Sequence, residues 1–254
     1  MPTVSMTGMG EYGIYAEYGH GVIRLDSNVT ISGRTDTTVA VFVADESRLV
    51  AKYCTFEDGQ SGVRANGNGA DTIINCRFNN NSLYGMYLWF SDIKDYTKGN
   101  VFENDATNGS DYGFLAELQS VKSLNDTVLG GFNWGFFLAR PVRADVTDLV
   151  MEAKEGDDWG LYISGPFNED DTAFVDHAVV TGSYDQAHCY LYRMTSVIVE
   201  NSDFISSGDD DASPYGIMDY GGGIVYEEDL EPNYGRVACC NILDHKTECV
   251  YTRI

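Results

Sequence analysis

The stretch "SLYGMYLWF" at residues 82–90 places an aromatic residue and a glycine directly before an almost wholly apolar run. The same order of residue types returns at five other places in the chain. These are "GEYGIYAEY" (10–18), "SDYGFLAEL" (110–118), "FNWGFFLAR" (132–140), "DDWGLYISG" (157–165) and "SPYGIMDYG" (213–221). A pattern that recurs every ~20–50 residues is typical of solenoids, propellers and other repeat architectures.

The glycines of this phrase are spaced by whole numbers of one repeat unit. Those at 85, 113, 135 and 160 follow one another at 28, 22 and 25 residues. The 72 residues from Gly13 to Gly85 divide into three units of 24, and the 56 from Gly160 to Gly216 into two of 28. Weaker copies lie where those units place them, at 38–44, 61–67 and 187–193. The spacing predicts about nine or ten units.

A second phrase follows the first in each unit, as in "YCTFEDG" (53–59), "NCRFNNN" (75–81) and "GNVFEND" (99–105). Short alternating segments ended by Asn, Asp and Gly indicate strands, and no segment keeps a helical period. We expect the glycine of the first phrase to turn a corner at φ values that other residues avoid. Inward residues should stack from coil to coil in a ladder of Phe56, Phe78, Phe102, Val128, Val150, Val180, Phe204 and Ile242.

The combination of aromatic-Gly-aliphatic with Asn-x-Phe-x-Asn, as in "YGMYLWF" and "GNVFEN", resembles the right-handed parallel β-helix repeat of the pectin-lyase-like superfamily. The resemblance runs from about Tyr12 to Tyr251. It implies an all-β fold, a right-handed single-stranded parallel β-helix (solenoid) of about nine or ten coils, in one domain over residues 1–254. A leucine-rich repeat is disfavoured by the few leucines, and a propeller by units too short for four strands. This likeness is specific for the fold and not for function.

The charge balance restricts the class of partner. Sixteen basic and 39 acidic residues give a net charge of −23, which repels nucleic acid and anionic lipid. No apolar run is long enough to span a bilayer. The opening "MPTVSMTGMG" has neither the basic start nor the apolar core of a signal peptide. We therefore expect no nucleic-acid partner, no membrane insertion and synthesis in a cytosol without a signal peptide.

The six cysteines give an expectation for the redox compartment. Cys54, Cys76 and Cys240 each stand two residues before a ladder residue. Side chains stacked on adjacent coils have parallel Cα–Cβ vectors, which are poorly aimed for a disulfide. The sequence thus favours buried, reduced thiols and assembly in a reducing cytosol. No Cys-x-x-Cys pair is present, so no zinc site is expected.

The motifs of related polysaccharide-cleaving enzymes are present only in fragments. "YGHGVIR" (18–24) contains the Gly-His-Gly of the polygalacturonase-type hydrolases, and "SSGDDDA" (206–212) resembles their paired aspartates. The order is reversed, and about eight coils would separate the two at ~4.8 Å per coil. We therefore expect His20 to be a turn residue. In a lyase-type site, Asp158, Asp171 and Asp210 would be the catalytic or calcium-binding carboxylates; the alternative is a solvated acidic rim.

The aromatic residues beside the corner glycine form a second candidate site. Tyr84, Tyr112, Trp134 and Trp159 belong to consecutive units and would line one edge of the coil. Aromatic side chains suit sugar rings and partner subunits, so these four are the predicted glycan- or partner-binding residues. The competing interpretation is that the rings stack on one another and only close the corner.

Function follows from these points as an expectation. A solenoid needs caps, and neither end of the chain shows one, so neighbours in an assembly would cover the ends. We expect a non-enzymatic structural β-helix of an extracellular-facing assembly, best exemplified by a virion component such as a capsid decoration, spike or tail protein. It would be a homo-oligomer or part of a larger assembly, trimeric or head-to-tail, and would also contact polysaccharide. The alternatives are a polysaccharide lyase or glycoside hydrolase and a sugar-binding adhesin. No cofactor is expected, with calcium the one ion left open.

Overall fold

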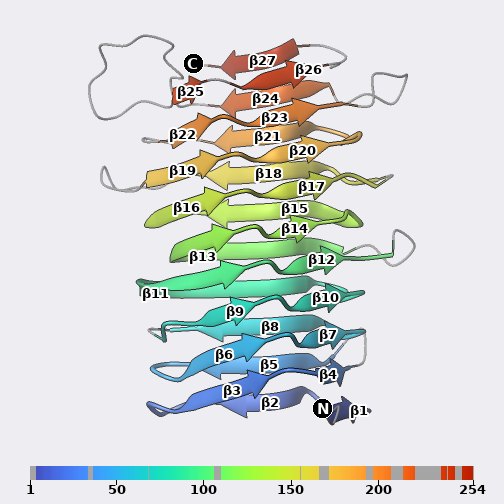
Figure 1. Cartoon of the computed structure of the whole chain (residues 1–254), viewed down its shortest axis with the longest axis vertical. Helices are drawn as coiled ribbons and strands as arrows, with labels where there is room; N and C mark the ends of the chain where they lie inside the picture. Colours follow the sequence, from blue (N-terminus) through green and yellow to red (C-terminus); the bar gives the residue numbers. More distant parts are fainter. Residues whose placement is uncertain are drawn as a thin grey trace.

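The described part of the chain winds into a right-handed parallel β-helix, drawn with its long axis vertical in Figure 1. The computed structural model describes residues 4–33, 37–67, 69–105, 110–154, 156–165, 172–192, 197–206, 214–220, 236–238, 240–243 and 248–253. Each coil passes through three parallel sheets, which we call the first, second and third sheet in chain order. The predicted all-β fold class is confirmed.

The first sheet contains ten of the described strands, and its order follows the chain. These are β1 (Val4–Thr7), β4 (Val29–Ser32), β7 (Thr55–Glu57), β10 (Arg77–Asn79), β12 (Val101–Glu103), β14 (Thr127–Val128), β17 (Val150–Glu152), β20 (Val179–Thr181), β23 (Asp203–Ile205) and β26 (Asn241–Leu243).

The second sheet carries the repeated aromatic-glycine phrase. Its strands are β2 (Tyr12–Ala16), β5 (Val39–Ala44), β8 (Ser61–Asn66), the first parts of β11 (Tyr84–Lys98) and β13 (Ser110–Leu124), β15 (Phe132–Ala139), β18 (Trp159–Ser164), β21 (Ala187–Tyr192), β24 (Tyr215–Tyr220) and β27 (Glu248–Arg253).

The third sheet completes each coil. It consists of β3 (Val22–Asp26), β6 (Arg48–Lys52), β9 (Thr72–Ile74), the second parts of β11 and β13, β16 (Arg143–Thr147), β19 (Thr172–Asp176), β22 (Val197–Glu200) and β25 (Arg236–Ala238). Because β11 and β13 pair with neighbours along both parts, these two strands continue through the corner between the second and third sheets.

The ladder of inward residues on the first sheet forms the centre of the core. Phe56, Phe78 and Phe102 pair in register and are buried, with ring centroids 5.2 and 4.8 Å apart. One predicted member is wrong: Val150 points outward and is 43% exposed, whereas Met151 lies in the ladder. Leu149 occupies the corner position that Asp126 holds in the preceding coil, so Val150 points outward and Met151, two residues after the corner, points inward as Val128 does.

At the corner between the third and first sheets, the alternation of inward and outward side chains starts again. At this corner the chain enters the left-handed region, with φ of 50–56° at Tyr53, Asn75, Asn125, Asp148, His177 and Asn201. The next residue turns inward, and polar members of this column bond from coil to coil. The Asn100 side-chain oxygen accepts from the Cys76 amide at 2.9 Å, and an Asp126 carboxylate oxygen accepts from the Asn100 amide at 2.8 Å. Side-chain oxygens thus satisfy amides that the sheets leave unpaired.

The glycines of the repeated phrase have a different purpose from the expected one. Gly85, Gly113 and Gly135 do not adopt positive φ. A Cβ on Gly113 would lie 2.6 Å from the Gly135 carbonyl oxygen of the next coil. Glycine is therefore required by the close approach of stacked backbones, and not by an unusual backbone angle.

The cysteines whose side chains are described carry thiols and are not in disulfides. They are Cys54, Cys76, Cys189 and Cys240, and the first three are buried. Cys54 and Cys76 occupy the same corner on adjacent coils, as predicted. Cys239 lies outside the described residues, as does the side chain of Cys249.

Within the described ranges, no helix is long and apolar enough to cross a membrane.

Candidate functional site

The four predicted aromatic residues lie side by side on the outer surface of the second sheet. Tyr84, Tyr112, Trp134 and Trp159 pair in register on β11, β13, β15 and β18, whose stacking Figure 1 shows. All four side chains are half-buried. The rings of Tyr84 and Tyr112 stack at 5.2 Å and 20°, and those of Tyr112 and Trp134 at 4.9 Å and 13°. The structure therefore brings the predicted residues together in one column.

A second aromatic column runs parallel to the first and was not predicted. It contains Tyr87, Phe137, Tyr162 and Tyr190, with Leu115 between Tyr87 and Phe137. Each of its members stands three residues after the first-column position of the same strand. That constant offset is visible in the sequence, as in "YGMY" at residues 84–87, and could have revealed the column.

The rings of the second column are packed at steeper angles than those of the first. Phe137 and Tyr162 meet edge to face at 4.4 Å, and Tyr162 and Tyr190 are tilted at 4.8 Å. Trp159, at the end of the first column, turns toward Tyr190 at 4.6 Å. We call the two columns together with Trp89 the aromatic face; Trp89 stacks beside Tyr87 at 6.4 Å and is 40% exposed.

Charged groups in this face are paired. The Tyr87 hydroxyl donates to a Glu117 carboxylate oxygen at 2.9 Å, and Arg140 forms an ion pair with the other oxygen of Glu117. The Arg64 guanidinium lies 5.2 Å from the centre of the Tyr84 ring, which caps the stacked column with a cation–π contact. The aromatic face is thus apolar and nearly neutral within a protein of net charge −23.

The packing determines which parts of the rings a partner can touch. In the first column the ring faces cover one another, and the Tyr84 face toward the preceding coil is covered by Arg64. Ring edges and hydroxyl groups remain at the surface. Burial raises the pKa of Tyr84 and Tyr112, so their hydroxyls stay protonated hydrogen-bond donors at neutral pH. This rigid surface suits a flat partner better than a single sugar ring that needs a free ring face.

The carboxylates of the alternative enzyme site are only partly described. Asp158 lies directly before β18 and is half-buried; burial, and then the neighbouring Asp185 carboxylate, raises its pKa. Asp171 and Asp210 lie outside the described residues.

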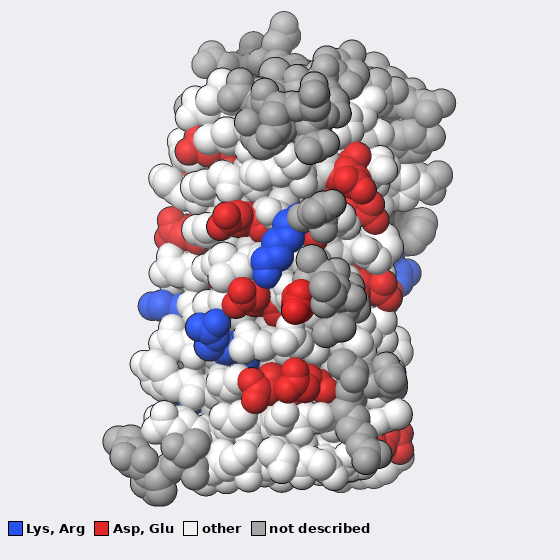
Figure 2. Space-filling model, turned by 90° about the vertical axis from the view of Figure 1, so that its right-hand side faces the viewer, with Lys and Arg blue, Asp and Glu red and all other residues white. Residues whose placement is uncertain are grey.

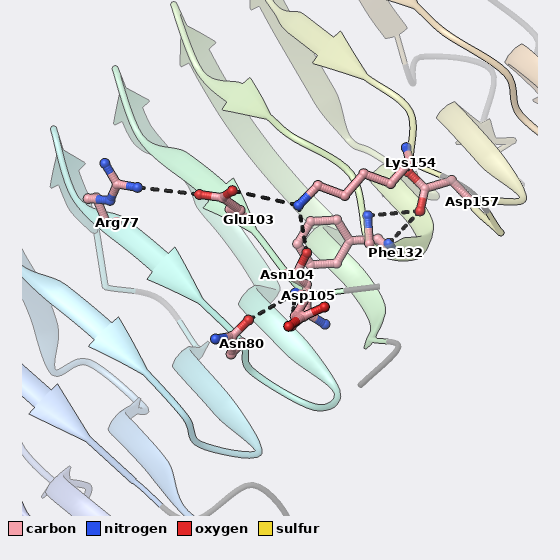
Figure 3. Close-up of polar contacts among 9 residues, drawn as sticks. Arg77, Asn80, Glu103, Asn104, Asp105, Phe132, Lys154 and Asp157 are labelled. Carbon is pink, nitrogen blue, oxygen red and sulfur yellow. Dashed lines mark hydrogen bonds and ion pairs between the residues drawn. The ribbon is translucent and has the colours of Figure 1, made fainter. Parts of the chain in front are cut away.

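The neighbouring Asp157 has a structural role, drawn in Figure 3. It is only 3% exposed, and its carboxylate accepts from the amides of Gly131, Phe132 and Lys154 at 2.8–2.9 Å. Burial, opposed by these bonds, raises its pKa to about 6. The Lys154 ammonium reaches back to Glu103 at 3.6 Å, so this group ties successive coils together at the corner.

The acidic and histidine side chains that the structure describes do not gather into a metal-binding cluster. Figure 2 shows the acidic side chains of one face in several separate groups. The described residues include no set of three or more His, Cys, Asp or Glu side chains that could hold a metal ion. The His20 side chain is 86% exposed and contacts Glu46, in keeping with a surface turn residue.

Comparison with known proteins supports the fold alone. No curated protein and no solved structure matches the chain. A family model described as "Right handed beta helix region" matches residues 3–139, which is more than half of the 254 residues. The chain therefore belongs to the family of proteins with a right-handed β-helix region.

Proposed function

We propose that this protein is a non-enzymatic surface component of an extracellular-facing assembly and that its aromatic face binds a protein partner in that assembly. A virion component, such as a capsid decoration, spike or tail protein, is the kind of assembly that we favour. The observation that carries this proposal is the aromatic face itself. It joins half-buried rings on consecutive coils into one rigid surface with paired charges.

The chemistry of the aromatic face resembles that of protein interfaces. Interface centres are enriched in Tyr, Trp and Phe and depleted in unpaired charge. Rings held by their neighbours lose little conformational freedom when a partner binds, which favours affinity. Because the face is nearly neutral, two copies can approach there despite the net charge of −23. A second copy of the chain is therefore the simplest partner.

The cysteines support the proposed site of synthesis. The four cysteines with described side chains are not in disulfides, and three of them are buried in the stack. Reduced, buried cysteines are the usual state in proteins made in a reducing compartment. A virion component is made there and then faces the outside.

The solution mass tests the proposal. The chain has a mass of 28.0 kDa, and we expect native mass spectrometry to find a multiple of this value. Replacing Trp89 and Phe90, which are 40% and 59% exposed at the end of the aromatic face, by serine should shift the distribution toward single chains. Val150→Ser, a replacement of a 43% exposed residue on the first sheet, is the matched control and should leave the oligomer intact.

A wild-type protein that stays at 28.0 kDa at all concentrations would contradict the self-assembly. A polysaccharide-cleavage screen provides the second arm of the test. Turnover that is lost in Asp158→Asn would overturn the non-enzymatic role and favour the lyase or hydrolase alternative.

A further inference from the structure

A lysine side chain crosses from one coil to another at the corner between the first and second sheets. Lys154 follows β17 and Asn104 follows β12, with the coil of β14 between them. The Lys154 ammonium donates to the Asn104 main-chain oxygen at 2.8 Å, across 50 residues of sequence. Figure 3 shows this side chain extended toward Asn104 and Glu103. The amine is therefore held against a residue that is distant in the chain.

The coil between them leaves room for this contact. Gly130 and Gly131 follow β14 and have positive φ values of 74° and 83°. A Cβ on Gly130 would lie 2.8 Å from the Lys154 Cγ atom, and a Cβ on Gly131 would lie 2.5 Å from the Asn104 main-chain oxygen. Side chains at these two positions would push the lysine and Asn104 apart, so the paired glycines keep the two residues in contact.

The Asn104 carboxamide has the surroundings of an activated electrophile. Asn104 is fully buried, and its side-chain oxygen accepts from the Asp105 amide at 3.1 Å. A donor on that oxygen stabilises the negative charge that develops there when a nucleophile attacks the carboxamide carbon. The Asn104 Nδ2 atom is buried and has no hydrogen-bond partner among the described residues. A buried donor without a partner costs free energy, and its loss as ammonia would remove this cost.

A proton acceptor and an anchor complete the arrangement. One Glu103 carboxylate oxygen lies 3.6 Å from the Lys154 Nζ atom, and the other lies 3.4 Å from an Arg77 terminal nitrogen. The buried Asp157 carboxylate accepts from the Lys154 amide at 2.8 Å, which fixes the start of the lysine side chain. A carboxylate beside an ammonium can take its proton and leave a neutral amine, which is a nucleophile.

We propose that Lys154 and Asn104 become joined by an isopeptide bond, which the folded chain forms without another protein. The Lys154 ammonium gives one proton to Glu103, and the neutral Nζ atom attacks the Asn104 Cγ atom. The bond between Nζ and Cγ forms and the bond between Cγ and Nδ2 breaks. The leaving nitrogen takes one Nζ proton and departs as ammonia, which then accepts the proton held by Glu103. One ammonium ion is released for each bond, and no oxidant or cofactor is consumed.

Proximity favours this reaction over attack by a free amine. The Nζ atom already contacts Asn104, and the Lys154 side chain is 35% exposed, so rotation of its stem can bring Nζ to Cγ. The product would connect the coils of β12 and β17 covalently across the coil of β14. This crosslink lies at a different corner from the aromatic face and does not depend on the assembly role proposed above.

Mass spectrometry of the intact, denatured protein tests the proposal. We expect a mass below that of the sequence by one ammonia molecule, in a fraction that rises during incubation of the folded protein. Proteolytic digestion should then yield one branched peptide that joins residues 104 and 154. This peptide distinguishes the crosslink from loss of ammonia at a single asparagine, which leaves the two segments separate.

Lys154→Arg is the principal variant, because it keeps the positive charge beside Glu103 and removes the nucleophilic amine. It should retain the full sequence mass and give no branched peptide. Glu103→Gln removes the proton acceptor and should slow the appearance of the branched peptide. Lys122→Arg is the matched control, since Lys122 is an exposed lysine on the third sheet, and it should crosslink as the wild-type protein does. Circular dichroism confirms that each variant is folded.

Three results would overturn the proposal. The first is a folded wild-type protein that keeps its full sequence mass after prolonged incubation. The second is a branched peptide that persists in Lys154→Arg, and the third is a loss of ammonia without any branched peptide between residues 104 and 154.

Discussion

Two adjacent residues on β17 provide a sharp test of the coil register. Met151 lies in the ladder of the first sheet between Val128 and Val180 and is fully buried, whereas Val150 is 43% exposed. Shortening a buried Met to Ala removes most of its apolar contacts and leaves a cavity, at a cost of ~2–5 kcal/mol. An exposed Val shortened to Ala changes the free energy of unfolding by no more than ~0.5 kcal/mol.

The assay is urea unfolding of Met151→Ala and Val150→Ala, followed by circular dichroism. We expect a large drop in the midpoint for the first variant and almost none for the second. The pair is matched because both changes remove apolar atoms from neighbouring positions of one strand. A larger loss in Val150→Ala would mean that the alternation follows the sequence-based ladder, and the register described above would be wrong.

The corner glycines and the buried carboxylates give two further predictions. Gly113→Ala places a Cβ 2.6 Å from the Gly135 carbonyl oxygen and should destabilise by ~1–3 kcal/mol in thermal unfolding. Gly10→Ala, with nothing within 4 Å, is the control, and equal effects would contradict the close-approach explanation. Burial raises the pKa of Asp71 to about 7 and of Asp95 to about 9 from the ordinary 3.8, so the folded chain keeps protons that the unfolded chain has lost. The urea midpoint should therefore fall as the pH rises from about 5 to about 8, and Asp95→Asn should flatten this dependence; an unchanged slope would refute it.

Much of the fold could be predicted because the same residue types recur at the same place in each coil. Phe56, Phe78 and Phe102 are each followed by Glu or Asn and then by Asp or Asn, so their ladder was visible. Val150 was wrongly assigned to the ladder because Leu149, Val150 and Met151 are all apolar, and each of them could be a core residue. Only the left-handed residue before them, Asp148, sets which one points inward, and its conformation is not apparent from the residue pattern.

The candidate sites differ in how far the sequence reveals them. The Tyr84 column was found because each member stands beside a corner glycine. The parallel column that starts at Tyr87 has an equally constant offset and was missed because it lacks such a marker.

The distance between two outward residues of the first sheet tests the stacking on which the aromatic face depends. Thr55 and Val179 lie in one column, five coils apart, through Arg77, Val101, Thr127 and Val150. At ~4.8 Å per coil their Cα atoms should be about 24 Å apart, although 124 residues separate them in the chain. Spin labels at these two positions, measured by double electron–electron resonance, should give one narrow distribution near this distance. A broad distribution, or a separation that does not correspond to five coils, would contradict the in-register parallel stack.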